Sequence, residues 1–495
     1  MAKEQRTIFI IFGGSGDLAH RKLYPALFKL YVKGYLQDHF AVIGTARRPW
    51  SHEYFRQTVM ESIGADIGDQ EKISSFAQHF YYQAHDVNDA NHYVALKKLA
   101  AQLSQQYQTG ANQIFYMAVA PRFFGTVASH INSEGLLTAQ GYNRLVIEKP
   151  FGRDLKSATE LNSSIAATFQ ENQIYRIDHY LGKEMVQALP LLRFTNPILE
   201  AVWNKNYLSN VQITLAETLG VGERAGYYET AGALRDMIQN HALQILGLVA
   251  MEKPQEFSSA AVHQEKSRLF AQLPTYSPEQ VAVNFVRGQY GADHKGNQLA
   301  YRQADNVADD SPIETFVAGK ILIDNPRWQG VPFYVRSGKR LCQKTTRIDL
   351  VFKTTANKIF SQAQLQEVAT QPVILSIFVE PTQGLSLALN GTNPGMALRP
   401  FMHTLDFWQS QEEMSNSQEA YEKLLIDIIH GDQTNFTNWQ EQEHTWRFID
   451  QIRQYWDQNV PQFPNYYSNS FGPKASNELL ARDGNEWVWS NEFGQ

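Results

Sequence analysis

A dense group of ionisable side chains lies between Arg176 and Glu184, where the sequence reads Arg-Ile-Asp-His-Tyr-Leu-Gly-Lys-Glu. Such runs are most often solvated surfaces, but two apolar residues interrupt this one, and it falls where the pattern of predicted strands changes. Ligand sites concentrate at junctions between domains. His179 and Lys183 would meet on one face if the segment were helical, whereas Gly182 favours a loop that turns into a helix and exposes backbone donors to an anion. The run is therefore a candidate anion site.

A second histidine, His241, lies in a predicted helix from about Tyr228 to Met251. At roughly 100° per residue, it stands in the middle of an otherwise apolar stripe. The other members of the stripe are Leu234, Ile238, Ile245 and Leu248. Taken alone, this position favours a core histidine whose ring nitrogens are hydrogen-bonded over a histidine with a chemical role. Asp236 is expected on another face of the helix.

Four cations follow a predicted strand that ends near Val335. They are Arg336, Lys339, Arg340 and Lys344. A basic hairpin loop and an anion-binding loop both fit this pattern. The single cysteine of the chain, Cys342, lies among them. An inert loop cysteine is the favoured interpretation, and the alternative is a reactive thiol whose pKa is lowered by the nearby cations.

A glycine-rich turn joins the first predicted strand, Ile8–Phe12, to a helical pattern over Arg21–Lys33. Its residues Gly14–Ala19 fit the pattern G-x-G-x-x-A. The first glycine of this pattern permits a tight turn, the second lets backbone N–H groups approach a pyrophosphate, and the small last residue lets the helix pack on the strand. Glycine turns also simply connect strands to helices, but with both flanks correct the pattern predicts dinucleotide binding.

Two arginines, Arg47 and Arg48, follow the second predicted strand, Phe40–Gly44. A site for NAD would place an acidic residue there, to bond the ribose 2′-hydroxyl. Arginines suit a 2′-phosphate through charge-assisted hydrogen bonds. Asp38 precedes the strand and is badly placed to replace the acid. The pattern favours NADP over NAD, and a solvated basic turn is the alternative.

The elements that must position these groups fall into two series. Up to about Ile177, short apolar runs alternate with helical patterns, which favours a parallel sheet covered on both sides. The runs are Ile8–Phe12, Phe40–Gly44, Ile114–Val119 and Leu145–Ile147, and the helical patterns are Arg21–Lys33, Ala90–Gln106 and Leu155–Phe169. We therefore predict a Rossmann-like α/β dinucleotide-binding domain over residues 1–177.

Strands with alternating patterns follow one another in the rest of the chain, which favours an antiparallel sheet. They are Val211–Leu215, Phe316–Ile323, Val331–Val335, Ile348–Phe352, Val373–Val379 and Leu385–Leu389. A further helix is predicted over Ala420–Ile429. We predict an α+β domain with a large, mainly antiparallel sheet over residues 178–495.

Composition excludes several classes of protein. Hydrophobic residues make up 43% of the 495 residues, enough for a large core, so that disorder is excluded. The net charge of −6 argues against a global attraction for nucleic acid or a membrane surface. One cysteine allows no intrachain disulfide and no zinc site built from cysteine. The apolar run Ile8–Gly13 is too short for a signal segment or a membrane span, so we expect a cytoplasmic enzyme.

The sequence resembles the bacterial-type glucose-6-phosphate dehydrogenases over nearly its whole length. Five segments carry the resemblance in the right order: Gly13–Ala19 with Lys22, Glu148–Gly152, Arg176–Glu184, Gly232–His241 and Val335–Arg340. The resemblance implies oxidation of D-glucose 6-phosphate at C1 to 6-phospho-D-glucono-1,5-lactone, the first step of the pentose phosphate pathway. It also implies a homodimer or homotetramer formed through the second domain.

Roles for single residues also follow from the resemblance. His241 would be the general base, Asp178 would hydrogen-bond it, and His179 with Lys183 would bind the 6-phosphate. The rest of the sugar site would be Glu217, Asp236, Lys339 and Lys344, with Lys22 between substrate and coenzyme. A histidine suits proton removal near neutral pH, and a carboxylate fixes its tautomer. No metal is needed, and no metal-ligand spacing is found.

By the same resemblance, the coenzyme is NADP, and NAD stays open as a second one. The coenzyme-binding residues would be Gly13, Gly14, Ser15, Gly16, Asp17, Leu18, Arg47, Arg48, Asp86, Val87 and Lys149. Pro150 would follow a cis peptide bond. Arg48 stands where family members that use both coenzymes carry an uncharged residue, which shifts the expected preference towards NADP.

Two rival functions are weaker. Tyr93 and Lys97 match the Tyr-x-x-x-Lys spacing of short-chain oxidoreductases, but Tyr93 lies on the apolar face of its predicted helix. A protein that only senses NADP or a sugar phosphate is expected to have lost the base or its carboxylate. Asp178 and His241 are both present, which favours an enzyme.

Overall fold

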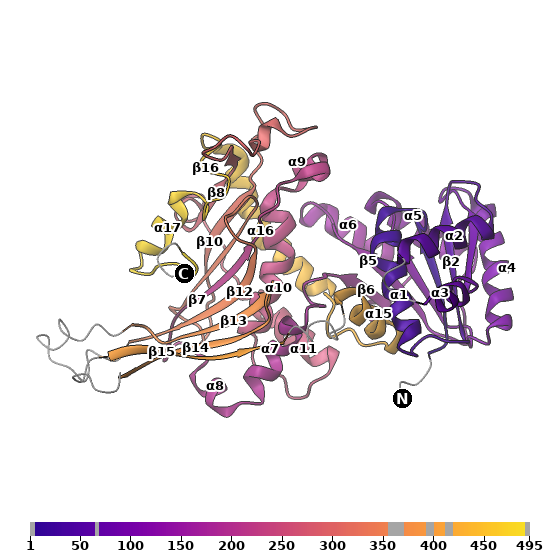
Figure 1. Ribbon diagram of the computed structural model, residues 1–495, viewed down its shortest axis with the longest axis horizontal. Helices are drawn as coiled ribbons and strands as arrows, with labels where there is room; N and C mark the ends of the chain where they lie inside the picture. Colours follow the sequence, from indigo (N-terminus) through magenta and orange to yellow (C-terminus); the bar gives the residue numbers. More distant parts are fainter. Residues whose placement is uncertain (1–4, 65–68, 355–370, 393–399, 411–418, 491–495) are drawn as a thin grey trace, which may run out of the picture. The chain divides into compact units, whose positions relative to one another are not determined.

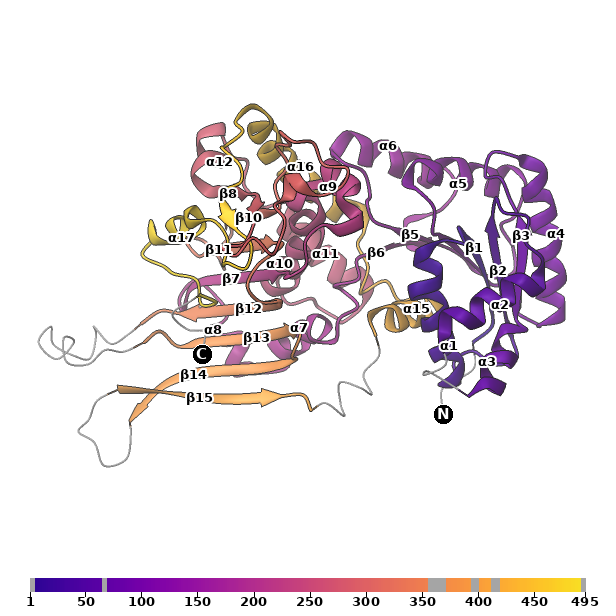
Figure 2. The same cartoon turned by 45° about the horizontal axis from the view of Figure 1, so that its top comes forward.

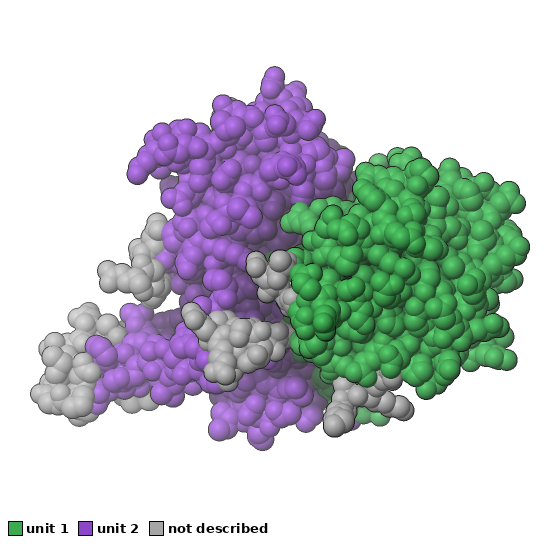
Figure 3. All heavy atoms as spheres, turned by 45° about the vertical axis from the view of Figure 1, so that its right-hand side comes forward, with its two compact units in different colours: residues 1–182, 256–263, 418–443 green, residues 183–255, 264–417, 444–495 purple. Residues whose placement is uncertain are grey.

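The computed structural model describes residues 5–64, 69–354, 371–392, 400–410 and 419–490. The chain forms two compact units, shown in two colours in Figure 3. Unit 1 comprises residues 1–182, 256–263 and 418–443, and unit 2 comprises residues 183–255, 264–417 and 444–495.

This division differs from the predicted one, which separates residue 177 from residue 178. Two later segments pack into unit 1, and one of them contains helix α15 (Ala420–His430). Leu424, Leu425 and Ile428 of α15 belong to the same apolar core as helix α1 (Tyr24–Val32). Patterns of strand and helix along the sequence do not reveal that the chain returns to its first unit.

Unit 1 is built on a six-stranded parallel sheet of order β3-β2-β1-β4-β5-β6 (Figure 1). Its strands are β1 (Thr7–Phe12), β2 (Phe40–Ala46), β3 (Phe80–Ala84), β4 (Gln113–Met117), β5 (Asn143–Glu148) and β6 (Ile174–Ile177). The strand order reverses beside β1. In open parallel sheets, ligands bind at the carboxyl ends of the strands at such a point.

Helices cover both faces of this sheet, as the uninterrupted apolar strands predict. Alternate residues of β1 point to opposite layers, with Phe9 and Ile11 in one core and Ile8 and Ile10 in the other. The first layer contains α1, α2 (His52–Ile63), α3 (Gln70–Ala77) and α15, and the second contains α4 (Ala90–Gln106), α5 (Phe124–Ser133) and α6 (Leu155–Ala166). The Rossmann-like prediction is confirmed.

Unit 2 contains an eight-stranded sheet of order β15-β14-β13-β12-β7-β11-β10-β8. Its strands are β7 (Leu208–Ala216), β8 (Phe285–Gly288), β10 (Phe316–Leu322), β11 (Pro332–Gly338), β12 (Thr345–Phe352), β13 (Ile374–Glu380), β14 (Gly384–Thr392) and β15 (Pro400–Trp408). Among the strands that the structure describes in this sheet, only the β7–β11 pair is parallel. Figure 2 shows β12 to β15 side by side. The prediction of a mainly antiparallel sheet is confirmed.

The predicted helix from Tyr228 to Met251 is broken into three parts. Helix α9 (Ala225–Ala233) contains Gly232, which has non-helical angles of φ 64° and ψ 172°. The segment η5 (Leu234–Ala242) follows as a π-helix, and α10 (Leu243–Ala250) continues as an α-helix. A glycine adopts such a positive φ without the steric cost of a side chain.

The π-helical segment overturns two expectations about its faces. Eight of its nine residues are buried, so His241 does not lie on a single apolar stripe. Hydrogen bonds in a π-helix run between residues five apart, which places such residues roughly one turn apart. Asp236 and His241 therefore lie on the same side of the helix, and not on separate faces as α-helical geometry implied.

The sequence patterns also missed several elements. Strands β3, β6, β8 and β15 and helices α2, α3, α5 and α7 (Glu184–Phe194) were not predicted. Pro190 lies inside α7, and propensity alone argues against a helix there. None of the helices in the described part of the chain combines the length and the apolarity needed to span a bilayer.

Replacement of Gly232 by alanine tests whether a glycine is required at the start of η5. A Cβ at this position would overlap the carboxylate of the buried Glu314, whose Oε1 accepts a hydrogen bond from the amide of Leu234 at 3.1 Å. The positive φ adds roughly 1–2 kcal/mol of strain. We expect Gly232→Ala to lower the urea midpoint of unfolding clearly.

Gly226 provides the matched control for this variant. It lies in the same helix, an added Cβ meets nothing within 4 Å, and its φ is not in the left-handed region. Gly226→Ala should leave the midpoint unchanged or raise it, since alanine is the better helix former. Equal midpoints for the two variants would contradict the role given to Gly232.

Candidate active site

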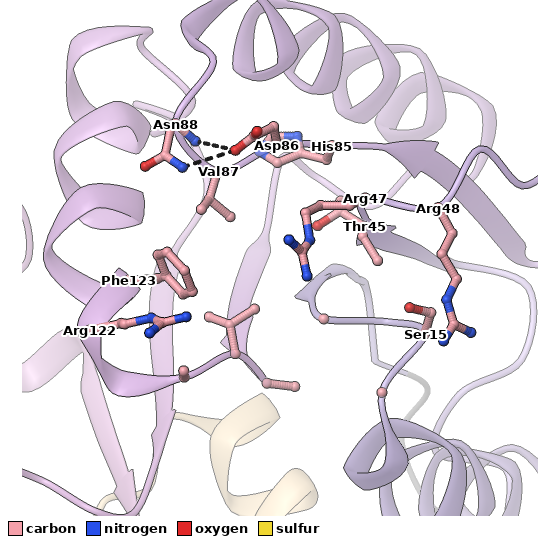
Figure 4. Close-up of a pocket in the computed structure, with 16 residues that line it drawn as sticks. Ser15, Thr45, Arg47, Arg48, His85, Asp86, Val87, Asn88, Arg122 and Phe123 are labelled. Atoms are coloured by element: carbon pink, nitrogen blue, oxygen red, sulfur yellow. Dashed lines mark hydrogen bonds between the residues drawn. The ribbon is translucent and has the colours of Figure 1, made fainter.

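A cavity in unit 1 opens where the glycine turn meets the carboxyl ends of β1 and β2 (Figure 4). Gly13 has φ +94°, and a Cβ there would overlap the carbonyl oxygen of Ala118. The amides of Gly13 and Gly14 donate to the carbonyl oxygen of Thr45 at 2.8 and 3.0 Å, and the amide of Gly16 donates to Gly13 at 2.9 Å. The tight turn is thus at Gly13, one residue earlier than the pattern predicted.

These bonds change which amides can meet a pyrophosphate. The amides of Gly13 and Gly14 already donate to β2, and that of Gly16 donates within the turn. The first amides of the helix that begins at Asp17 have no acceptor within that helix. These amides lie at the N-terminus of the helix, which is the positive end of the helix dipole. Ala19 is fully buried and packs the helix on the sheet, as expected. Lys22 is exposed on the same helical segment.

Arginines line the cavity, which has a volume of about 480 Å³. In Figure 4 the guanidinium of Arg47 points into the cavity, and that of Arg48 lies beside Ser15. The Arg48 guanidinium also lies 5.4 Å from the ring centre of Trp50. The cavity thus gathers cations where an NAD site would carry an acid.

Asp86 and Val87, which the resemblance assigned to the coenzyme, line the same cavity. The amide of Asn88 donates to the Asp86 carboxylate at 3.0 Å and holds the pKa of that carboxyl below its ordinary value. Sequence reasoning missed Arg122 and Phe123, which enter the cavity from the segment after β4. The sequence did contain a signal for Arg122, because this residue follows a buried parallel strand just as Arg47 does.

The predicted coenzyme residue Lys149 lies next to a cis peptide bond with Pro150, as the resemblance implied. Its neighbour Glu148 accepts hydrogen bonds from the hydroxyls of Tyr116 at 2.5 Å and Tyr421 at 3.1 Å. Withdrawal from water raises the pKa of Glu148 to about 7, against the opposing effect of the two hydroxyls. This carboxyl thus changes charge near neutral pH.

Asp178 and His179 follow β6 in unit 1. Asp178 is 1% exposed, and its carboxylate accepts the amide of Tyr180 at 2.9 Å. Its carbonyl oxygen accepts the amide of Leu181 at 3.0 Å. The segment is therefore a turn and not the helix that would pair His179 with Lys183. The turn leads into α7 at Lys183, as Gly182 suggested.

A second cavity, of about 400 Å³, lies in unit 2 and contains Glu217 and Lys339. The Lys339 ammonium donates to Glu217 Oε2 at 2.7 Å and lies 5.1 Å from the ring centre of Tyr228. Lys339 is 7% exposed. Because a cation withdrawn from water needs a counter-charge, this pair holds both groups in place.

Asp236 belongs to the same region of unit 2. Tyr227 donates its hydroxyl to Asp236 Oδ1 at 3.2 Å, and an Arg224 nitrogen lies 3.9 Å from that oxygen. Arg224 also lines the cavity of Lys339. Sequence reasoning missed Arg224, Tyr227 and Tyr228. His241, one turn along η5 from Asp236, is fully buried.

Lys183 and Lys344 lie together in unit 2, although 161 residues separate them. Both ammonium groups contact Glu380, at 2.8 and 3.3 Å. Glu380 directly follows the predicted strand Val373–Val379 and is the last residue of β13, but nothing in the sequence pattern marked it. Cys342 nearby departs from expectation, since partial burial raises the pKa of its thiol above the ordinary value. This direction of the pKa favours the inert loop cysteine over the reactive one.

The predicted site residues are distributed over both units. Asp178 and His179 belong to unit 1 with the arginine-lined cavity, and the other residues predicted for the sugar site, apart from Lys22, belong to unit 2. The rival Tyr93 is fully buried and donates its hydroxyl to the carbonyl oxygen of Val87 at 2.8 Å. It is a packing residue, as its predicted apolar face indicated.

The parallel sheet with its strand reversal, the glycine turn and the arginine-lined cavity define a nicotinamide-dinucleotide-binding protein of the dehydrogenase class. Residues 10–188 match the family model "Glucose-6-phosphate dehydrogenase, NAD binding domain", and residues 190–488 match "Glucose-6-phosphate dehydrogenase, C-terminal domain". The chain belongs to the glucose-6-phosphate dehydrogenase family and is an NAD(P)-dependent dehydrogenase that acts on a CH–OH group.

Relatives named glucose-6-phosphate 1-dehydrogenase align over nearly their whole lengths. Those of Streptococcus pneumoniae and Leuconostoc mesenteroides are each 47% identical over 99% of this chain, covering 98% and 100% of the relative. The Bacillus subtilis enzyme is 46% identical over 98% of this chain and 99% of its own. A solved glucose-6-phosphate dehydrogenase in complex with glucose 6-phosphate has a TM-score of 0.89 at 34% identity, covering 98% of this chain and 100% of that one.

The raised pKa of Glu148 predicts a pH-dependent loss of stability. The folded state binds a proton more tightly than the unfolded state, so its advantage is present below the ordinary glutamate pKa of 4.5 and is lost as pH rises to about 7. Glu148→Gln cannot lose a proton. The urea midpoint of the variant minus that of the unmodified protein should therefore increase between pH 5 and pH 8.

The exposed Glu160 offers a control, because its carboxyl lies in water on α6. The difference for Glu160→Gln should stay constant with pH. A constant difference for Glu148→Gln as well would show that the Glu148 carboxyl is ionised at neutral pH.

Proposed function

We propose that the protein oxidises D-glucose 6-phosphate at C1 to 6-phospho-D-glucono-1,5-lactone, with NADP as the preferred coenzyme. The main support for this substrate is the match of 99% of the chain to enzymes named glucose-6-phosphate 1-dehydrogenase, at 47% identity. The polar groups of unit 2 support it, since Glu217, Lys339 and Asp236 offer a sugar both donors and acceptors.

The chemistry requires one base and one hydride acceptor. Bound NADP would supply the acceptor for the hydride that leaves C1 with its electron pair. His241 takes the proton of the C1 hydroxyl, so that the C1–O bond becomes the carbonyl of the lactone. The Asp178 carboxylate stabilises the resulting imidazolium, and its own conformation is fixed by the amide of Tyr180.

The ends of the substrate need different partners. Lys183 and His179 hold the 6-phosphate, because a dianion requires a cation and further donors. Lys344 joins them, since its ammonium shares Glu380 with Lys183. Glu217, Asp236 and Lys339 orient the hydroxyls, and Lys22 contacts substrate and coenzyme.

The coenzyme cavity suits a dinucleotide with an extra phosphate. Arg47, Arg48 and Arg122 supply three cations, and the helix that begins at Asp17 supplies amide donors. The acid that an NAD site places after the second strand is absent from Gly44–Arg48. Asp86, Val87 and Lys149 complete the proposed coenzyme site.

An absorbance assay at the band of the reduced nicotinamide tests the function. Purified protein should reduce NADP with glucose 6-phosphate and far less with glucose, which lacks the phosphate. No reduction with glucose 6-phosphate and either coenzyme would refute the proposal. Equal rates with glucose would refute the phosphate-binding part alone.

We also propose that the protein is a homodimer or a homotetramer. The outer strands of the large sheet support this, because they expose an apolar face. Leu385 pairs with Phe407 and Leu387 with Leu405, and the side chains of Leu405 and Phe407 are 62% and 56% exposed. Exposed apolar faces of this kind are typical of interfaces. Sedimentation equilibrium of the purified protein decides between monomer and oligomer.

Coenzyme choice gives a sharp prediction for Arg47. A charge-assisted hydrogen bond contributes roughly 1.5–3 kcal/mol, and about 1.4 kcal/mol is a tenfold change. We expect kcat/KM to favour NADP by at least about tenfold. Arg47→Ala should collapse this ratio by lowering kcat/KM for NADP and not for NAD.

Arg48→Ala is the matched variant, because its guanidinium also lies near the ring of Trp50. It should reduce the ratio by less than Arg47→Ala does. Equal kcat/KM values for NADP and NAD in the unmodified protein would contradict selection by these arginines.

A further inference from the structure

Glu380 lies between two lysines that come from distant parts of unit 2. Its Oε1 lies 2.8 Å from the ammonium of Lys183, and its Oε2 lies 3.3 Å from that of Lys344. Glu380 is the last residue of β13, Lys183 directly precedes α7, and Lys344 directly precedes β12. In the sheet Glu380 pairs with Thr346, which places it at the end of β12 where Lys344 lies.

The three groups differ in their exposure to water. The side chain of Lys183 is 11% exposed, that of Glu380 is 29% exposed, and that of Lys344 is 55% exposed. Burial alone would raise the pKa of the Glu380 carboxyl, but the two ammonium groups hold it below its ordinary value. Glu380 is therefore an anion at neutral pH and offsets the charge of the mostly buried Lys183.

We infer that Glu380 occupies the anion site of Lys183 and Lys344 as a built-in counter-ion and lowers the affinity of this site for phosphate. A carboxylate offers two oxygens to the two ammonium groups, as two oxygens of a phosphate would. The inference deepens the proposed function and rests on its assignment of Lys183 to the 6-phosphate. An incoming phosphate must displace Glu380 or share the lysines with it, and both cases weaken its binding.

Competition with Glu380 weakens the binding of inorganic phosphate and of a sugar phosphate by about the same free energy, because both engage the two lysines. Inorganic phosphate has no contacts beyond the anion site, so competition with Glu380 reduces its occupancy. A sugar phosphate recovers the loss through hydroxyl contacts with groups such as Glu217 and Lys339. Glu380 thus limits occupation of the site by free phosphate.

A purely structural role for Glu380 predicts the opposite result. If the carboxylate only held the lysines in position, its removal would loosen them and weaken the binding of anions. The two roles therefore differ in the sign of the change in phosphate affinity.

Glu380→Gln separates the two, because glutamine keeps the shape and loses the charge. Binding of inorganic phosphate to the coenzyme-free protein is measured by titration calorimetry at low ionic strength. We expect the Kd for phosphate to fall by at least about threefold, since one repelling charge is removed. Binding that becomes detectable only in the variant counts as such a fall.

Two further variants serve as controls. Glu478→Gln makes the same change of net charge at an exposed pair with Lys474, 3.5 Å apart in unit 2, and should leave the Kd unchanged. Glu380→Asp keeps the charge and should stay close to the unmodified protein. A Kd for Glu380→Gln that is unchanged or higher would overturn the inference, as would equal tightening by the Asp or the Glu478 variant.

The measurement is independent of turnover. Tighter phosphate binding in Glu380→Gln together with no oxidation of glucose 6-phosphate by the unmodified protein would refute the proposed function and leave the counter-ion role intact. Oxidation of glucose 6-phosphate without the change in phosphate affinity would overturn the role of Glu380 alone.

Discussion

A cation that is withdrawn from water must have a counter-charge, and most of the proposed substrate site follows from this constraint. Lys339 is 7% exposed and is held by Glu217, and Lys183, which is also mostly buried, is held by Glu380. The carboxylates fix the ammonium groups in place before a ligand arrives. They also set how much free energy a ligand must supply to engage those groups.

The arginine-lined cavity of unit 1, the proposed coenzyme site, balances its cations in a different way. Arg47, Arg48 and Arg122 line an open cavity where water screens their charges, so they need no dedicated partners. Their proposed anion is the coenzyme itself. The contrast explains why Arg47 and Arg48 could be predicted from their place after a parallel strand, whereas Glu380, the partner of Lys183 and Lys344, could not.

The fold could be predicted where one physical signal dominated. Uninterrupted apolar strands indicated the parallel sheet, and α4 has the predicted bounds of Ala90–Gln106. The pairing of distant segments could not be predicted, because α15 joins unit 1 through contacts that no local pattern records. Glu380 was missed for the same reason, because its role depends on contacts with Lys183 and Lys344, which are distant in the sequence.

Backbone geometry accounts for the other differences at the site. The motif G-x-G-x-x-A was located correctly, yet the tight turn is at Gly13, which only its φ reveals. Asp236 and His241 were placed on separate faces because α-helical geometry was assumed. The non-helical Gly232 and the π-helical turns after it bring them to one side. Short π-helical segments are frequent at functional sites, and no residue pattern in this sequence predicts one.

The most direct test of the proposed chemistry is the turnover of His241→Asn. Loss of the base alone should lower kcat for glucose 6-phosphate oxidation by about 10²–10⁴-fold. The KM for glucose 6-phosphate should change little, because the phosphate and hydroxyl contacts remain. The urea midpoint shows whether the variant is folded. A folded variant that retains more than about a tenth of the unmodified kcat would contradict the assignment of His241 as the base.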